Sequence, residues 1–133
     1  MFSRLGLCAL GLFHLVNGAW MIASPNSWYW TTAGVAATGP MNPHFIVDVG
    51  LAFLASGAGL LMGLGAGPQA AAFALAGATW PVLHALFHIW QWLAHGFPVQ
   101  TDVAATEMIG VVGLAALGAG LAFIRGRQEG VIP

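Results

Sequence analysis

Four uninterrupted apolar segments fill most of this 133-residue sequence and limit its fold more strongly than any other feature. They run from about 5–24, 43–64, 68–94 and 103–124. Each is ~20 residues or longer, which in an α-helix is enough to cross the ~30 Å hydrocarbon core of a bilayer. Glycine and alanine dominate, and no strand-like alternation of apolar and polar residues competes with a helical interpretation. We therefore predict an all-α integral membrane four-helix bundle that forms a single domain over residues 1–133.

The composition agrees with a membrane protein and excludes several other classes. Hydrophobic residues make up 59% of the chain and charged residues 5%, whereas soluble domains carry about 25% charged residues. The net charge of -1 leaves no basic surface for nucleic acid. The single cysteine, Cys8, excludes an internal disulfide and any CxxC motif. We expect the lipid bilayer, and not nucleic acid, to be the partner.

The few cationic residues predict an orientation. Arg4, Arg125 and Arg127 are the only Lys or Arg residues. Four spans put both ends of the chain on one side of the membrane, and the positive-inside rule places Lys and Arg in the cytoplasm. We therefore expect cytoplasmic N- and C-termini in a multi-pass protein of the cell inner membrane. The first segment should be retained, because Met21 stands where cleavage after Ala23 would require a small residue.

The first outer loop is expected to be the longest non-helical stretch, PNSWYWTTAGVAATGPMN. Its Trp28, Tyr29 and Trp30 suit the headgroup region, where aromatic side chains form belts. The helix after this loop should begin abruptly, because Asn42 is a good N-cap and Pro43 suits the first helical position.

Glycines predict close helix packing. Small residues let helix backbones approach one another, and the second and fourth segments hold several: Gly57, Gly59, Gly63, Gly110, Gly113, Gly118 and Gly120. We expect these positions to lie in tight helix contacts. A small bundle with many glycine faces is also expected to form a homo-oligomer or to join a larger membrane complex.

The third apolar segment contains a polar stripe within PVLHALFHIWQWLAHG. Its members follow helical positions i, i+4, i+7 and i+11: His84, His88, Gln91 and His95. This spacing lines one face of a helix, and we expect Trp80, Trp90 and Trp92 to flank the stripe on other faces. A polar stripe inside a membrane is expensive, so it indicates a functional site.

Polar residues on the other segments lie at matching depths. Asp48 and Glu107 each fall about one turn inside the outer end of their helix, and His44 precedes Asp48 by four residues. On the first segment, Asn17 and His14 lie roughly 10 Å and 15 Å below the outer end. If these faces turn inward, the bundle holds a polar core that opens toward the outside.

The first interpretation of this core is a transition-metal site. Imidazole and carboxylate groups bind Zn, Fe or Mn, and Cu(II) is a further candidate. The predicted metal ligands come from three helices: His84, His88, Asp48 and Glu107. The other polar residues are expected to form an outer shell or an access path: His44, His95, Gln91, Asn17 and His14.

Three alternatives stay open. His14 and His84 lie at similar depth on different helices, as the two ligands of a b-type haem would. The polar core could instead be structural, in a non-catalytic accessory or assembly subunit, although such hydrogen bonds contribute only ~0.6–2 kcal/mol each. A proton or small-solute path without metal is the third alternative. No nucleophile elbow, phosphate loop or nucleotide motif is present, so whether the protein is an enzyme stays open.

The first 65 residues resemble small four-helix bacterial membrane proteins of a DoxX-like kind. The resemblance rests on GLFHLVNGAWMIASPNSWY and TGPMNPHFIVDVG, a glycine-rich first helix followed by an aromatic loop and a Pro-capped second helix. It implies a four-helix bundle and a redox-associated accessory role. It transfers no catalytic residue, and the polar stripe of the third segment is outside the pattern.

Overall fold

The computed structural model describes residues 2–133, and these residues are helical or irregular, without a strand. The helical elements in chain order are α1 (Phe2–Ala23), α2 (Pro25–Thr31), η1 (Val35–Thr38), α3 (Pro43–Met62), α4 (Pro68–His95), α5 (Thr101–Ala105), η2 (Thr106–Gly113) and α6 (Leu114–Gln128). The last three run on as one continuous helix, of which η2 is a π-helical segment. The all-α class is thereby confirmed.

Four helices are long and apolar enough to cross a membrane: α1, α3, α4 and the continuous helix from α5 to α6. They correspond to the four predicted segments, with ends that differ by about one helical turn or less. Large apolar side chains such as Val16, Leu83 and Leu93 are exposed on their outer surfaces. Such a surface fits contact with lipid, and the chain has the features of a multi-pass membrane protein.

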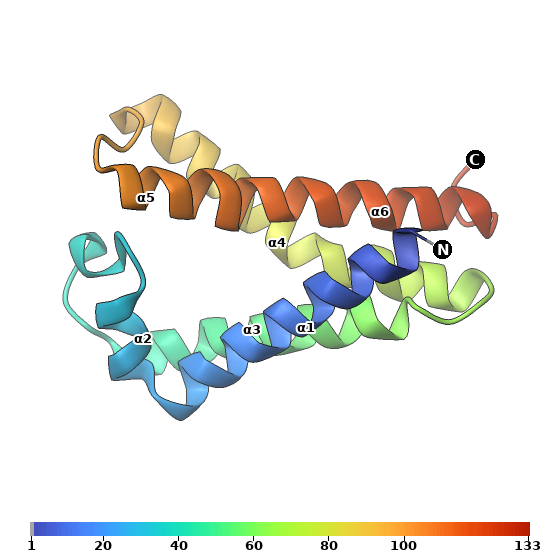
Figure 1. Cartoon of the computed structure of the whole chain (residues 1–133), viewed down its shortest axis with the longest axis horizontal. Helices are drawn as coiled ribbons and strands as arrows, with labels where there is room; N and C mark the ends of the chain where they lie inside the picture. The colour runs from blue at the N-terminus through green and yellow to red at the C-terminus, as the bar shows by residue number, and fades with distance from the viewer. Residues whose placement is uncertain (1) are drawn as a thin grey trace.

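The helices pack in the order α1, α3, α4, α6, and a lighter contact between α6 and α1 closes the ring. Figure 1 shows both termini at one end of the bundle, as an up-and-down arrangement of four helices requires. Toward the opposite end, α1 and α3 diverge from α4 and α5 (Figure 1). The two ends of the molecule are therefore packed differently.

Paired glycines bring α1 and α3 together. A Cβ on Gly57 would lie 2.8 Å from the carbonyl oxygen of Gly11, and a Cβ on Gly18 would lie 2.6 Å from that of Gly50. The glycines are seven residues apart in each helix, so one antiparallel register satisfies both contacts. Because the obstructing atoms are backbone, only glycine fits at these crossings.

The prediction that the glycines lie in tight helix contacts is confirmed for the second segment and is wrong for much of the fourth. Gly59 of α3 packs against Gly77 of α4, and Gly63, which caps the end of α3, packs against Ala74. On the last helix, a Cβ added at Gly110 or Gly120 would meet nothing within 4 Å. The reason is that this helix is the least buried of the four, so much of its circumference faces away from the bundle.

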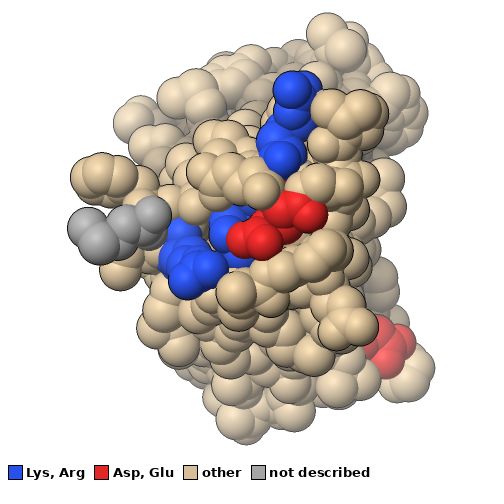
Figure 2. Space-filling model, turned by 90° about the vertical axis from the view of Figure 1, so that its right-hand side faces the viewer, with Lys and Arg blue, Asp and Glu red and all other residues tan. Residues whose placement is uncertain are grey.

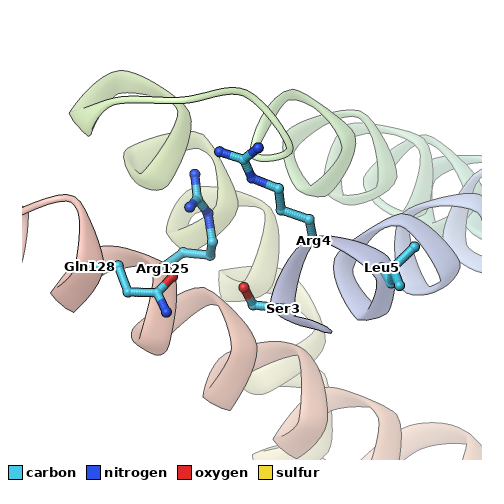
Figure 3. Close-up of a pocket in the computed structure, with 5 residues that line it drawn as sticks. All are labelled: Ser3, Arg4, Leu5, Arg125 and Gln128. Atoms are coloured by element: carbon cyan, nitrogen blue, oxygen red, sulfur yellow. The ribbon is translucent and has the colours of Figure 1, made fainter. Parts of the chain in front are cut away.

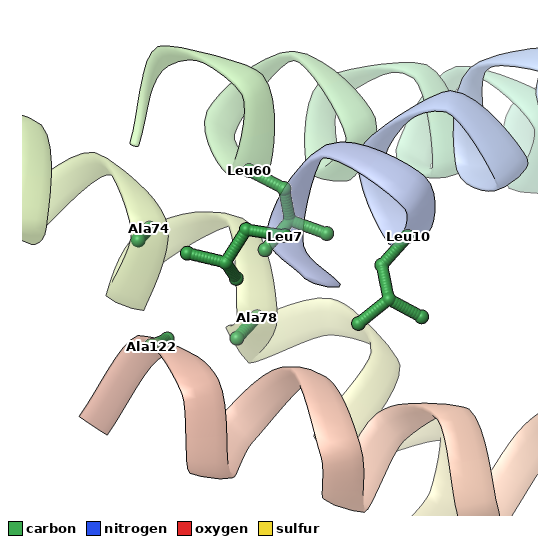
Figure 4. Packing of buried hydrophobic residues seen from close by; sticks show 6 residues of the cluster. All are labelled: Leu7, Leu10, Leu60, Ala74, Ala78 and Ala122. Carbon is green, nitrogen blue, oxygen red and sulfur yellow. The ribbon is translucent and has the colours of Figure 1, made fainter. Parts of the chain in front are cut away.

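Two apolar cores stabilise the two ends of the bundle. The core near the termini contains small and branched side chains from all four long helices: Leu7, Leu10, Leu60, Ala74, Ala78 and Ala122 (Figure 4). The core at the other end joins Met21, Tyr29 and Ile46. The polar residues of the predicted site lie mainly between these two cores or beyond them.

The loop between the first and second apolar segments differs from its prediction. It is largely helical, since α2 begins with a proline at its first position and η1 follows it. Of the three aromatic residues expected at the headgroups, only Trp30 is exposed, at 69%. Tyr29 is buried, and its hydroxyl donates to the carbonyl of Gly39 at 2.6 Å. The loop thus folds back onto the bundle and does not serve simply as an interfacial anchor.

The start of α3 confirms its prediction. The side chain of Asn42 accepts a hydrogen bond from the backbone N–H of Phe45 at 3.1 Å, and Pro43 occupies the first turn. The cap provides an acceptor for a backbone donor that the first turn leaves unpaired.

Candidate functional site

The buried centre of the site begins with a proline. Pro81 lies inside α4 and has no N–H, so the carbonyl of Gly77 lacks its usual helical partner. Ser56 of α3 donates its hydroxyl to that carbonyl at 2.6 Å. The same hydroxyl oxygen lies 3.1 Å from Nδ1 of His14 on α1. Since the Ser56 proton is used on Gly77, we assign the N–H of the His14 ring to Nδ1.

Aromatic rings connect this centre to the histidines of α4. The Phe53 ring contacts His14 at 5.4 Å and His84 at 6.4 Å between ring centroids. Trp80 stacks on His84, with centroids 5.4 Å apart and ring planes 18° apart. His84 and His88 then meet edge to face at 4.8 Å.

The expectation that Trp80 and Trp92 lie on other faces of the helix is therefore wrong. Trp80, His84, His88 and Trp92 follow one another at intervals of four residues, which places them along one side of a helix. Trp90 is 56% exposed and does lie on another face. The four-residue spacing was visible in the sequence.

Glu107 is brought to this row from the neighbouring helix. It is the second residue of η2, the π-helical segment that contacts α4. Its Oε2 accepts a hydrogen bond from Trp92 Nε1 at 2.5 Å and lies 3.5 Å from His88 Nδ1. The side chains of His88 and Glu107 retain 20% and 21% of their exposure, so the pair is half-buried and accessible at its edge.

Asp48 lies apart from the other three predicted ligands. It pairs with His44 at 3.4 Å on the first turns of α3, where the two side chains are 56% and 88% exposed. Among residues 2–133, the structure gives it no hydrogen bond or ion pair with His84, His88 or Glu107. The i, i+4 pairing of His44 with Asp48 is as expected, whereas Asp48 stands outside the central group.

The other residues that were predicted to form an outer shell or an access path lie in different parts of the structure. Gln91 is half-buried on α4, and His95 is exposed at its end, near Trp90. Asn17 takes part in a local network on α1, where its side-chain oxygen accepts from Trp28 Nε1 at 3.0 Å. Asn17 therefore holds α2 against α1.

The described part of the chain contains no group of three or more His, Cys, Asp or Glu side chains arranged to hold a metal ion. What the site offers is two adjacent imidazoles, a carboxylate in contact with one of them, and an indole donor that orients the carboxylate. Such a set can bind a cation or exchange a proton between His88 and Glu107.

Two residues of the site escaped the sequence-based prediction. Ser56 is a lone polar residue in an apolar helix, and its signal is indirect: Pro81 inside an apolar segment creates an unpaired carbonyl. Trp92 is visible in the sequence beside the polar stripe, but its role as a donor to Glu107 depends on the packing of two helices and has no local signal.

Comparison with known proteins adds no identification, since no family model, curated protein or solved structure matches this chain significantly. The resemblance to DoxX-like proteins therefore stays a prediction.

Proposed function

We propose that this protein binds a divalent transition metal within the membrane through His84, His88 and Glu107. The proposal narrows the predicted ligand set by leaving Asp48 out, because that residue pairs with His44 on an exposed surface. Zn, Fe, Mn and Cu(II) all accept imidazole and carboxylate ligands. The metal would serve a redox, delivery or structural role in a multi-pass inner-membrane protein.

One distance supports the proposal most directly. His88 Nδ1 and Glu107 Oε2 are 3.5 Å apart. Two ligand atoms bound at 2.0–2.2 Å to one tetrahedral ion are about 3.3–3.6 Å from each other. The pair thus already has the separation of two donors on one metal, whereas the His84 ring, which lies against the His88 ring, would have to turn toward the ion to become the third donor.

The π-helical geometry of η2 provides independent support. π-Helical turns are rare and occur frequently at functional sites. Here the segment begins at Thr106, one residue before Glu107, and presents that carboxylate to α4. Trp92 donates to the same carboxylate, as residues around metal ligands commonly do.

The test is metal content. Detergent-purified protein would be loaded with Co²⁺ or Zn²⁺, desalted and measured by elemental analysis, and the Co²⁺ sample also by visible absorption. We expect one tightly held ion in the wild type and affinity at least about tenfold weaker in His88→Gln and Glu107→Gln.

His95→Gln is the matched control, because it removes an exposed histidine from the same helix. It should retain the ion. Folded wild-type protein that holds no metal, or equal retention in all four proteins, would contradict the proposal.

A second candidate is a non-catalytic accessory or assembly subunit whose polar core is structural. The observation that favours it is the chain of hydrogen bonds from His14 through Ser56 to Gly77, which joins three helices. The redox-associated accessory role implied by the DoxX-like resemblance agrees with this candidate. Protein that is free of metal but loses stability in Ser56→Ala and Glu107→Gln would favour it.

The b-type haem alternative has less support. The Phe53 ring contacts both His14 and His84, so a haem ligated by these histidines would compete with Phe53 for space. A Soret band that disappears in His14→Ala would restore this alternative.

Self-association is proposed through the last helix. Gly110 and Gly120 face open space, and Ile109 and Leu117 are more than half exposed on the same helix. Small residues on an uncovered helix let a second helix approach closely. A second copy or another membrane subunit is the expected occupant, and cross-linking in the membrane would distinguish the two.

A further inference from the structure

The end of the bundle that holds both termini gathers the positive charge of the molecule. All the Lys and Arg residues of the chain are arginines near its two ends, Arg4, Arg125 and Arg127. Figure 2 shows them on this face, beside an acidic side chain. If the long helices span the membrane, this face lies at the level of lipid headgroups.

Arg125 is almost fully buried at this end, with 3% of its surface exposed. Its Nη1 donates to Glu129 at 2.8 Å, and its Nη2 donates to the carbonyl of Gly65 at 2.6 Å. Glu129 also accepts from the backbone N–H of Gly67 at 2.9 Å. These bonds attach the end of α6 to the turn between α3 and α4.

One donor of this guanidinium is left over. Nε of Arg125 is buried and has no hydrogen-bond partner in the described chain. Buried donors of charged groups are nearly always paired in proteins. An acceptor from outside the described residues is therefore expected next to Arg125, and it reaches Nε only after the neighbouring side chains shift, because this atom is buried.

Arg125 lines a pocket of about 390 Å³, a volume typical of small-molecule sites. The other lining residues are Ser3, Arg4, Leu5 and Gln128, drawn in Figure 3. Arg4 comes from α1 and Arg125 from α6, so the pocket joins the two ends of the chain. Ser3 and Gln128 add a hydroxyl and an amide that can donate hydrogen bonds.

The charges around this pocket select an anion. Glu129 compensates the charge of Arg125, whereas Arg4 makes no ion pair among residues 2–133. One net positive charge, a guanidinium with an unpaired Nε–H and two neutral donors suit a singly charged phosphate ester. The exposed side chain of Leu5 gives the pocket one apolar edge.

We propose that this pocket binds a phosphate ester, supplied by an anionic lipid headgroup or by a soluble phosphate compound. The site is at the opposite end of the bundle from His88 and Glu107 and does not depend on the proposed metal.

The experiment measures thermal unfolding of the full chain in detergent with increasing phosphatidylglycerol. Diacylglycerol with the same acyl chains lacks the phosphate, and glycerophosphoglycerol keeps the singly charged phosphodiester but lacks the chains. We expect phosphatidylglycerol to raise the unfolding midpoint and diacylglycerol to leave it unchanged. A similar rise with glycerophosphoglycerol identifies a soluble ester as the source, and its absence identifies the lipid.

Arg4→Gln is the decisive variant, because Arg4 is exposed and no helix contact depends on its charge. It should bind phosphatidylglycerol at least about tenfold more weakly. Arg127→Gln is the matched control: it removes the same charge from the same end without touching the pocket lining.

Arg125→Lys keeps the charge and removes Nε–H, and should also weaken binding where circular dichroism shows that it folds. If it does not fold, Arg4→Gln alone decides. No midpoint shift with either phosphate compound, or equal shifts in Arg4→Gln and Arg127→Gln, would overturn the proposal.

Discussion

The missing backbone N–H of Pro81 determines the hydrogen bonds at the buried centre of this protein. Because Pro81 lacks an N–H, Gly77 offers a free carbonyl, Ser56 occupies it, and His14 is held by Ser56 in turn. In a bilayer no water can replace these bonds, so each unpaired group is costly. The polar residues here compensate for a break in the helix.

Replacing Ser56 by alanine should therefore destabilise the fold. The change leaves the carbonyl of Gly77 and Nδ1 of His14 unpaired, and we expect a loss of about 1–3 kcal/mol in the free energy of unfolding. Unfolding in mixed micelles would measure it. Thr79→Ala is the control, since Thr79 is exposed and bonds only within its own helix, and it should change stability by less than about 0.5 kcal/mol.

A double-mutant cycle tests the cause. Pro81→Ala restores an N–H that can donate to Gly77, so the cost of Ser56→Ala should fall in that background by about 0.5 kcal/mol or more. If the cost is the same in both backgrounds, the missing proline N–H is not the reason why Ser56 matters.

At the scale of the helix, glycines lie at close backbone contacts between α1 and α3 and between α3 and α4. Gly18 lies against the backbone of α3, whereas Gly120 faces open space. Gly18→Ala should cost about 1–3 kcal/mol through overpacking. In monomeric protein, where no second copy covers the last helix, Gly120→Ala should be neutral or stabilise by up to about 1 kcal/mol, because alanine favours a helix. Equal effects in an unfolding assay would contradict the observed register of α1 and α3.

The π-helical segment η2 sets the direction of Glu107. Deleting Val111 should convert η2 to a regular α-helix and rotate Glu107 by about 100° relative to α6. We expect metal affinity to fall as in Glu107→Gln while helical circular dichroism is preserved. Gly110→Ala keeps the segment length, adds a Cβ in open space and should bind metal normally. Normal binding after the deletion would show that the segment does not position the carboxylate.

Local signals in the sequence were sufficient for the helices and insufficient for the site. The cap at Asn42 and the proline after it were predictable because both depend on neighbouring residues. Asp48 shares its depth with Glu107, but depth along a helix does not determine which way a side chain points. Glu107 contacts His88 from a π-helical segment, and the spacing of apolar residues in the sequence does not predict such a segment.

For the whole molecule, the location of charge predicts an orientation. Both termini and all arginines lie at one end (Figures 1 and 2), and the positive-inside rule places that end in the cytoplasm. In a Cys8→Ser background, a cysteine at Val131 should resist a membrane-impermeant maleimide in intact cells, and one at Ser27 should react. The opposite labelling pattern would reverse the proposed orientation and place His88 and Glu107 toward the cytoplasm.

The unequal packing of the two ends also determines where the molecule opens first. The end near the termini is held by the core around Leu7 and Leu60, to which all four long helices contribute, whereas α5 and η2 contain no buried residue. Amide protons near the termini should therefore exchange slowly with solvent, and those around Glu107 should exchange through frequent local unfolding. A cation could then reach His88 and Glu107 through fluctuations of the last helix while the rest of the bundle stays folded.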